Sequence, residues 1–469
     1  MKRVYIYLAT IMLTAVCMSA GWSAGTPKRE VSLETKMVSL WNDKMGVIRA
    51  GMTLSPNLRR VAYAVRHNAN NQLFVIVDGK GGDQFKDIYL PVFSPDSKRI
   101  AYYAYTGSGW VVVVDGKELG PYPALGIDTL AFSPDSKRLA YVMNDGKDLF
   151  MVIDGQKQDK AYANVGKPVF SPDGKRLAYW VTDQAGSACV IVDGKAGSSY
   201  SAIMVDTLTF SPDSKRMTYL AKTADKWHVV ADGYTEKPDD PSPLGRLIFS
   251  PDSKRLAYVA AKGDKQLAVV DGQPGAECDG IGSNTLTFSP DSQHTAYLAG
   301  KGSKWAVVVD GKEIKEYAGI GKGSLIFSPD STQAAFIGQE GDKWCAVVGG
   351  KEGKGYSSVN KLVFSPDGKR SAYTAYDGDK RYAGIDGKEQ GPYDAICKEG
   401  VFFSPDSKHA AYAVQHDGKW FVLLDGLESE PVDDMLGDGK LVFDTPTSLH
   451  FIANKGSGAC RVEVRLVEK

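Results

Sequence analysis

Short runs of apolar residues, bounded by Gly, Pro, Asp and Ser, recur along the chain from about residue 40 onward. Residues 139–142 and 305–309 are two such runs. Runs of this length with period-two patterning predict β-strands rather than helices, and no long stretch with a helical period is present beyond residue 40. The pattern therefore predicts an all-β fold.

These runs belong to an internal repeat. The string FSPDSKRLAY at Phe132 recurs unchanged at Phe249. Near-identical copies begin at Phe93, Phe170, Phe210, Phe288, Phe327, Phe364 and Phe403, and degenerate copies at Leu54 and Phe443. The starts lie 37 to 40 residues apart, which gives eleven units and leaves no room for an inserted domain.

Each unit predicts four strands, a to d. Strand a ends at the Phe, and Ser-Pro-Asp forms the turn into strand b because proline suits the second turn position. Strand c ends in Asp-Gly, which is typical of a two-residue type I′ hairpin turn into strand d. The Asp of this second turn recurs at positions 78, 115, 154, 193, 232, 271, 310, 386 and 425, and Gly349 replaces it once.

A four-stranded sheet of this size cannot bury both faces alone, so stacked blades of a β-propeller are expected. The last unit stops after its third strand, and we expect residues 45–50 to supply the missing strand d. Eleven blades exceed the usual four to eight, so we expect two propellers, residues 25–243 with five blades and 244–469 with six, because three prolines interrupt residues 234–244. One continuous propeller over residues 25–469 is the alternative.

The unit F-S-P-D-[SG]-K-R-x-A-Y resembles the WD-repeat-like propeller repeat of the TolB family, which also occurs in the N-terminal propellers of dipeptidyl-peptidase-like proteins. The resemblance covers about residues 52 to 455. It implies the fold and says little about activity, because propellers of this kind serve many functions. The Asp-Gly-Lys string departs from TolB itself, and the N-terminal domain expected of TolB has no counterpart here.

The first 24 residues are typical of a bacterial export signal, with Lys2 and Arg3 before an apolar run and small residues after it. We expect cleavage near residues 20 to 25 and a periplasmic or secreted monomer with no transmembrane segment in the mature chain; a retained anchor and lipidation of Cys17 are the alternatives. Equal totals of 56 basic and 56 acidic residues argue against a nucleic-acid partner. The mature chain keeps five cysteines, which we expect to be buried free thiols: Cys189, Cys278, Cys345, Cys397 and Cys460.

The sequence gives no support for a catalytic site. The one G-x-S-x-G match, at residues 21–25, falls inside the export signal. The six histidines lack metal-ligand spacing, and His294 and His409 stand where other units carry Arg, so we expect solvated turn residues there. The turn aspartates each have a turn role, which argues against calcium. We therefore predict no catalytic residue, no cofactor and no metal.

Because the strands alternate in direction, the a–b and c–d turns share one face and the variable b–c and d–a loops share the other. Variable loops on a rigid frame usually carry binding. Five tryptophans beside these loops, with two aspartates before strand a, form a candidate rim: Trp110, Trp227, Trp305, Trp344, Trp420, Asp128 and Asp206. We expect a non-enzymatic scaffold for a protein, peptide or cell-envelope polymer. An alternative is a glycan lyase or hydrolase with carboxylates at the channel mouth.

Overall fold

The computed structural model describes residues 31–39, 47–66, 72–89, 91–232, 234–235, 242–456 and 458–468. The predicted export signal, His67 and Leu90 lie outside these residues. The described chain is all-β, and its strands form eleven antiparallel sheets of four strands, in most of which strand a is split in two. The sheets follow one another in sequence order and are called blades 1 to 11 here. This confirms the predicted fold class, an all-β chain of propeller-type blades.

Contacts divide the chain into a larger unit, Gly46–Ala334 with Gly338–Glu340, and a smaller unit, Met1–Met45 with Ala335–Ile337 and Gly341–Lys469. The division falls within one strand of blade 8. Residue 243, the predicted division between two propellers, lies inside the larger unit, and the partition into five and six blades stays a prediction.

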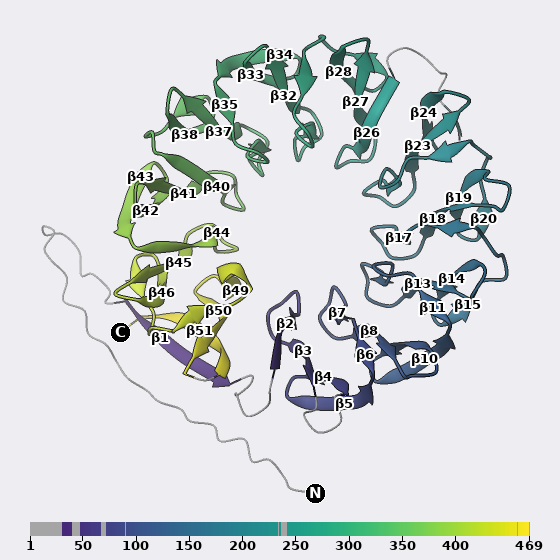
Figure 1. Cartoon of the computed structure of the whole chain (residues 1–469). Helices are drawn as coiled ribbons and strands as arrows, with labels where there is room; N and C mark the ends of the chain where they lie inside the picture. Colours follow the sequence, from purple (N-terminus) through teal and green to yellow (C-terminus); the bar gives the residue numbers. More distant parts are fainter. Residues whose placement is uncertain are drawn as a thin grey trace, which may run out of the picture. The chain divides into compact units, whose positions relative to one another are not determined.

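In the larger unit, Figure 1 shows successive blades in sequence order. Blades 1 to 4 consist of β2 (Val47–Leu54), β3 (Val61–Arg66), β4 (Leu73–Val77) and β5 (Lys80–Phe85); β6 (Asp87–Ile88), β7 (Val92–Phe93), β8 (Ile100–Tyr105), β9 (Trp110–Val114) and β10 (Lys117–Tyr122); β11 (Ala124–Leu125), β12 (Ala131–Phe132), β13 (Leu139–Asn144), β14 (Leu149–Ile153) and β15 (Gln156–Lys157); and β16 (Asn164–Val165), β17 (Val169–Phe170), β18 (Leu177–Thr182), β19 (Ala188–Val192) and β20 (Lys195–Ala196).

Blades 5 to 7 consist of β21 (Ala202–Ile203), β22 (Thr209–Phe210), β23 (Met217–Thr223), β24 (Lys226–Ala231) and β25 (Tyr234–Thr235); β26 (Ser242–Phe249), β27 (Leu256–Lys262), β28 (Lys265–Val270) and β29 (Gln273–Pro274); and β30 (Gly280–Ile281), β31 (Thr287–Phe288), β32 (Thr295–Lys301), β33 (Lys304–Val309) and β34 (Lys312–Tyr317). The strands of blade 8 are β35 (Gly319–Ile320), β36 (Ile326–Phe327), β37 (Ala334–Glu340), β38 (Lys343–Val348) and β39 (Lys351–Glu352).

The smaller unit holds blades 9 to 11. They consist of β40 (Ser358–Phe364), β41 (Ser371–Asp377), β42 (Lys380–Ile385) and β43 (Lys388–Tyr393); β44 (Ala395–Phe403), β45 (Ala410–His416), β46 (Lys419–Leu424) and β47 (Leu427–Glu428); and β48 (Asp434–Met435), the 3₁₀ turn η1 (Gly437–Gly439), β49 (Val442–Thr445), β50 (Ser448–Lys455), β51 (Gly458–Glu468) and β1 (Val31–Ser39).

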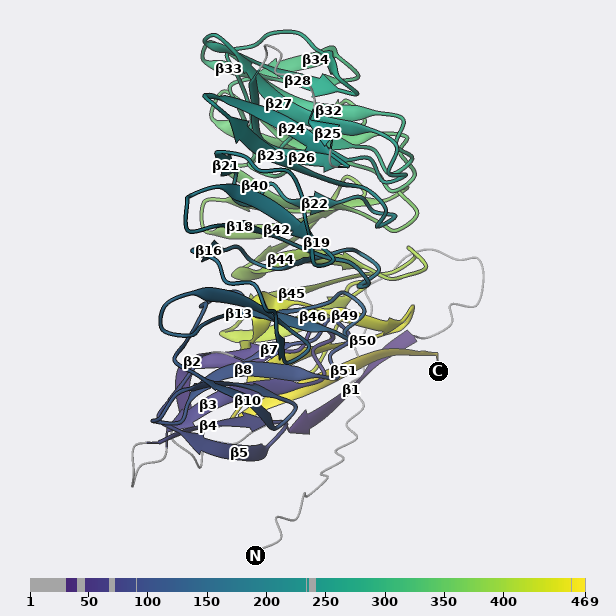
Figure 2. The same ribbon diagram turned by 90° about the vertical axis from the view of Figure 1, so that its right-hand side faces the viewer.

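The last blade is completed by a strand from the other end of the chain, as predicted, but not by the predicted segment. β1 pairs with β51 along nine residues, from Val31 opposite Glu468 to Ser39 opposite Cys460. Figures 1 and 2 show these two strands side by side. Residues 47–50 belong instead to β2, which runs directly into the first Ser-Pro turn and is therefore strand a of blade 1. The strand that completes the last blade therefore comes from residues 31–39, upstream of the predicted segment.

Both predicted turn types are present. In the c–d turn of blade 2, Asp115 and Gly116 have φ values of 52° and 85°, the left-handed pair that a type I′ turn needs. In the a–b turn, the Ser97 amide donates to the Ser94 carbonyl at 2.8 Å, which closes a four-residue turn around Pro95.

The hydrophobic core lies between consecutive blades. One buried cluster joins Tyr103 and Val112 of blade 2 to Tyr141 and Val152 of blade 3. Corresponding clusters join blades 3 and 4, 4 and 5, 6 and 7, 9 and 10, and 10 and 11. The sheets joined by these clusters thus bury faces against one another, as expected for sheets that cannot bury both faces alone.

Candidate functional site

The repeated arginine joins seven of the blades to the blade that follows, on the side of the a–b and c–d turns. In blade 2, Arg99 Nε donates to Asp115 Oδ2 at 2.9 Å, and Arg99 Nη1 donates to the carbonyls of Ser136 and Lys137 in blade 3 at 3.3 and 3.0 Å. Its guanidinium carbon lies 5.3 Å from the ring centroid of Phe132, also in blade 3. The arginines with the same aspartate pairing and aromatic contact are Arg60, Arg99, Arg138, Arg176, Arg216, Arg255 and Arg370.

The Ser-Pro-Asp turns form a second link between blades. The Ser133 hydroxyl donates to Asp135 Oδ1 at 2.6 Å, and this hydrogen bond, with the Lys137 amide, lowers the pKa of Asp135 from its usual range. The Asp96 amide donates to the Ser136 hydroxyl of the next blade at 3.0 Å. These contacts, with the arginine contacts, are called the interlock here. Its residues are the most repeated ones in the sequence. Because they join one blade to another, folding explains their repetition without a ligand.

Two histidines take the place of the arginine in the interlock. His294 Nδ1 lies 2.6 Å from Asp310 Oδ2, and His409 Nδ1 lies 2.5 Å from Asp425 Oδ2. They were expected to be solvated turn residues; their side chains are 45% and 23% exposed, and each also bonds the aspartate of its own c–d turn. Where Gly349 replaces that aspartate, Gln333 replaces the arginine. This paired substitution is the sequence signal from which the contact could have been inferred.

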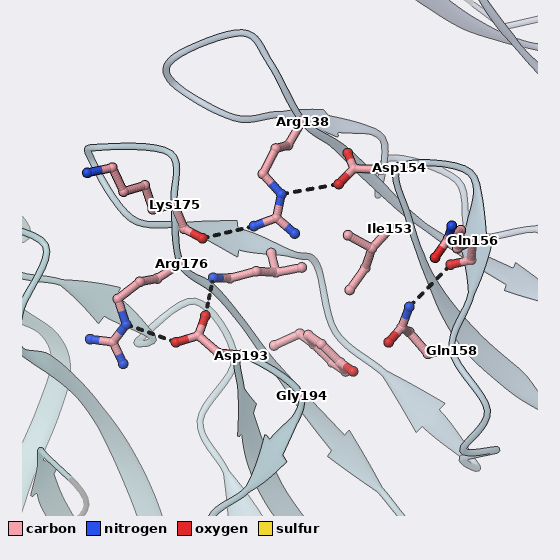
Figure 3. Close-up of a pocket in the computed structure, with 11 residues that line it drawn as sticks. Arg138, Ile153, Asp154, Gln156, Gln158, Lys175, Arg176, Asp193 and Gly194 are labelled. Carbon is pink, nitrogen blue, oxygen red and sulfur yellow. Dashed lines mark hydrogen bonds and ion pairs between the residues drawn. The ribbon is translucent and has the colours of Figure 1, made fainter.

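The junction between blades 3 and 4 contains a cavity of about 620 Å³ on the turn side (Figure 3). Its lining includes Arg138 and Arg176, each beside the aspartate with which it pairs, Asp154 and Asp193. The cavity is of the size that small-molecule ligands occupy. Sequence reasoning placed binding on the opposite face and missed it.

Asp128 and Asp206 lie in bulges in the middle of strand a rather than in loops before it. In blade 3 the bulge separates β11 from β12, and Asp128 has a φ of 64°; Asp206 in blade 5 has the same value. The Thr129 hydroxyl donates to the Gly126 carbonyl at 2.7 Å and accepts from the Val142 amide at 2.9 Å, which holds the bulge in place. Such bulges also protect an edge strand from pairing with another chain. They are called edge bulges here.

The edge bulges of blades 3 and 5 each expose an apolar residue beside the aspartate. Ile127 is 55% exposed and Val205 is 57% exposed, the highest values among the large hydrophobic side chains that the structure describes. The sequence repeat hid them, because this position varies between units: Ser283 and Lys322 stand there in blades 7 and 8. Two rigid pairs of an apolar and an acidic side chain are thus presented to solvent.

The five predicted tryptophans lie at the starts of strands β9, β24, β33, β38 and β46, each on its own blade and each half-buried. Trp110 contacts the rings of Tyr89 and Tyr105, at centroid distances of 5.5 and 5.2 Å. Trp227 and Trp420 pack against the buried clusters of their blades. Trp305 stands opposite Tyr317 in the strand register, and Trp344 opposite Tyr356. The role of these residues in binding stays a prediction.

The cysteines and His450 have surroundings that favour a structural role. The five cysteines that the structure describes are free thiols; four are buried and Cys189 is half-buried, and burial raises the pKa of Cys397 to about 12. His450 is buried and bonds Asp444 at 2.8 Å. Within the described residues there is no group of three or more His, Cys, Asp or Glu side chains able to hold a metal ion. No helix long and apolar enough to cross a membrane occurs in that part of the chain.

Comparison with known proteins gives distant likenesses to solved structures. No protein-family model and no curated protein matches the sequence. TolB from Acinetobacter baumannii is 20% identical over 46% of this chain and 63% of its own, with a TM-score of 0.25. A putative dipeptidyl aminopeptidase IV from Bacteroides ovatus is 13% identical over 78% of this chain and 65% of its own, with a TM-score of 0.34. The propeller domain of the trilobed protease from Pyrococcus furiosus is 13% identical over 57% of this chain and 97% of its own, with a TM-score of 0.27.

Proposed function

We propose that this protein is an exported, non-enzymatic binding scaffold that engages a protein, peptide or cell-envelope polymer through the edge bulges and b–c loops of its blades. The observation that carries the proposal is the contrast between the interlock, whose charged groups bond one another, and the edge bulges, whose apolar and acidic side chains face solvent. Rigid presentation of a few side chains lowers the entropy that binding costs.

The placement of the acidic residues supports a scaffold over an enzyme. A glycosidase needs two carboxyl groups within about 5 to 10 Å of one another. Asp128 and Asp206 belong to blades 3 and 5, with the whole of blade 4 between them in the chain. Both are held by turn geometry that the repeat uses elsewhere, since Asn284 has the same left-handed conformation in blade 7.

A variant pair tests the proposal. The mature protein is crosslinked in an envelope extract, its partners are identified by mass spectrometry, and binding of the purified partner is then measured. The double variant Ile127→Ser, Val205→Ser is expected to lose the partner. The variant Ile314→Ser is the matched control because Ile314 is another exposed apolar residue of the larger unit, 49% exposed, outside the edge bulges. Equal binding by all three proteins would contradict the proposal, as would recovery of no specific partner.

A further inference from the structure

The junction between blades 3 and 4 departs from the interlock in its hydrogen bonds. Gly174 stands where most other units carry serine, so the Asp135 amide has no serine hydroxyl to bond, unlike the Asp96 amide with Ser136. Arg138 Nη1 reaches one carbonyl, that of Lys175 at 2.9 Å, where Arg99 reaches two. The junction is therefore the least tightly bonded one among those that keep the arginine and its aspartate.

The side chains at this junction also differ from the repeat. Gln158 stands where blades 1, 4, 6 and 8 carry glycine, at Gly82, Gly197, Gly275 and Gly353. It lies beside Gln156, and its Nε2 donates to the Gln156 carbonyl at 3.3 Å. Figure 3 shows both glutamines across the cavity from Arg176 and Asp193. Two amide side chains thus face the cavity, at a junction where the interlock makes fewer hydrogen bonds.

Tyr179 adds an unused hydroxyl to the lining. The side chain is 3% exposed and lines the cavity, and burial raises its pKa to about 12, so the hydroxyl keeps its proton at neutral pH. At other junctions the corresponding hydroxyls pair, as in Tyr122 with Tyr141 at 2.9 Å and Tyr393 with Tyr412 at 3.0 Å. Within the described chain, no hydrogen bond reaches the Tyr179 hydroxyl. The hydroxyl is therefore free to donate to a molecule in the cavity.

The lining is rich in donors and carries a positive charge. Among the lining residues, Arg138, Lys175 and Arg176 contribute three positive charges and Asp154 and Asp193 two negative ones; Lys175 also lies 3.8 Å from Asp173, which is outside the lining. Both carboxylates already accept from an arginine and a backbone amide. The Nη2 group of Arg138 makes no hydrogen bond to any described residue. The lining therefore suits a ligand with many acceptors and a negative charge.

We propose that this cavity binds an acidic oligosaccharide of the uronate class. A uronate carries hydroxyls at nearly every ring carbon and one carboxylate, which matches guanidinium, amide and phenol groups that converge on one cavity. The apolar part of the lining is small, since Ile153 is half-buried and Leu177 is buried, so a peptide with large apolar side chains would gain little there. The site lies on the turn side and is separate from the edge bulges of the proposed function.

Removal of the Tyr179 hydroxyl group alone tests the site. Tyr179→Phe is expected to weaken binding of a uronic acid trimer by about 5- to 10-fold in calorimetry, because one hydrogen bond is lost. The fold tolerates the change, since Phe336 and Phe451 occupy the corresponding position in blades 8 and 11. Tyr297→Phe is the matched control: the Tyr297 hydroxyl also has no hydrogen bond within the described residues, but it does not line this cavity. Equal affinities for both variants and the unaltered protein would overturn the assignment.

A charge test distinguishes the ligand class. Arg138→Gln is expected to reduce the preference for the uronate trimer over the neutral hexose trimer, whereas Arg99→Gln, which removes the same contact at the junction between blades 2 and 3, leaves the preference unchanged. Higher salt should weaken uronate binding. Equal binding of the neutral trimer, equal binding of an acidic peptide or of inorganic phosphate, or no binding of the uronate trimer at millimolar concentration would each overturn the proposal.

Discussion

The turn side and the edge bulges of the same blades use aspartate in opposite ways. On the turn side, Asp115 accepts from Arg99 through one oxygen and from the Ile100 amide through the other, at 2.9 Å each. In the edge bulge of blade 3, Asp128 is exposed and makes no hydrogen bond with any described residue. The first kind recurs in nearly every unit and the second varies. Repetition in this chain therefore marks the residues that join blades, and variation marks side chains that face solvent.

Acid is expected to have the largest effect, because it acts on the interlock in nine blades together. The serine hydroxyls lower the pKa of nine Ser-Pro-Asp aspartates below the usual value of 3.8: Asp96, Asp135, Asp173, Asp213, Asp252, Asp291, Asp330, Asp367 and Asp406. The unfolded chain then binds protons more readily than the folded one. The stability that these aspartates contribute is therefore present above pH 3.8 and is lost as pH falls through the lowered pKa values.

Thermal unfolding measured from neutral to acid pH checks this expectation. The melting temperature should hold down to about pH 4 and then fall as the pH drops further. Asp135→Asn should reduce the acid-dependent part of the loss. A melting temperature that stays constant into strong acid would show that the serine–aspartate bonds do not contribute to stability.

The next largest effect is expected in the edge bulge, from Thr129→Val. The change removes the hydroxyl that bonds the Gly126 carbonyl and the buried Val142 amide. Leaving that amide without a partner should lower the free energy of unfolding by about 1–3 kcal/mol, measured by urea denaturation. Thr129→Ser, which keeps the hydroxyl, is the control and should stay within about 0.5 kcal/mol. An equal loss in both variants would assign the effect to packing.

A smaller effect separates two junctions of the interlock. Arg99→Ala should lower the free energy of unfolding by about 1–2 kcal/mol, because it removes a partly exposed ion pair, two carbonyl hydrogen bonds and an aromatic contact. Arg138→Ala should cost about 0.5–1 kcal/mol less, since Arg138 bonds one carbonyl fewer. Equal losses in urea denaturation would show that the cavity junction is as tightly joined as the others.

The smallest effect is expected from Asp128→Asn. Asparagine tolerates the left-handed conformation, and Asn284 occupies the corresponding position of blade 7 with a φ of 58°. Stability should change by less than about 0.5 kcal/mol, while binding of a partner at the edge bulge should lose its dependence on this charge. A large loss of stability would mean that the Asp128 carboxylate belongs to the frame.

The repeat alone predicted the strands, the two turn types and a strand from the N-terminal end that completes the last blade. These features are local: proline, Asp-Gly pairs and short apolar runs determine them within one unit. The choice of completing strand was wrong because residues 31–39 and 47–50 both suit a strand, and only pairing distinguishes them. The arginine interlock was missed because its partners lie about 37 residues away, in the next blade.

The sequence by itself determined the all-β class, the eleven units and the position of every repeated turn, because each depends on residues that are neighbours in the chain. Tertiary structure alone decided that Asp128 and Asp206 lie in rigid bulges and that the tryptophans are half-buried. It also decided that Gln158, Arg176 and Tyr179 meet at one cavity. The physical reason is that each feature depends on contacts between residues that are distant in the chain. The bulges depend on bonds between strands, and the cavity exists only when two units are packed face to face.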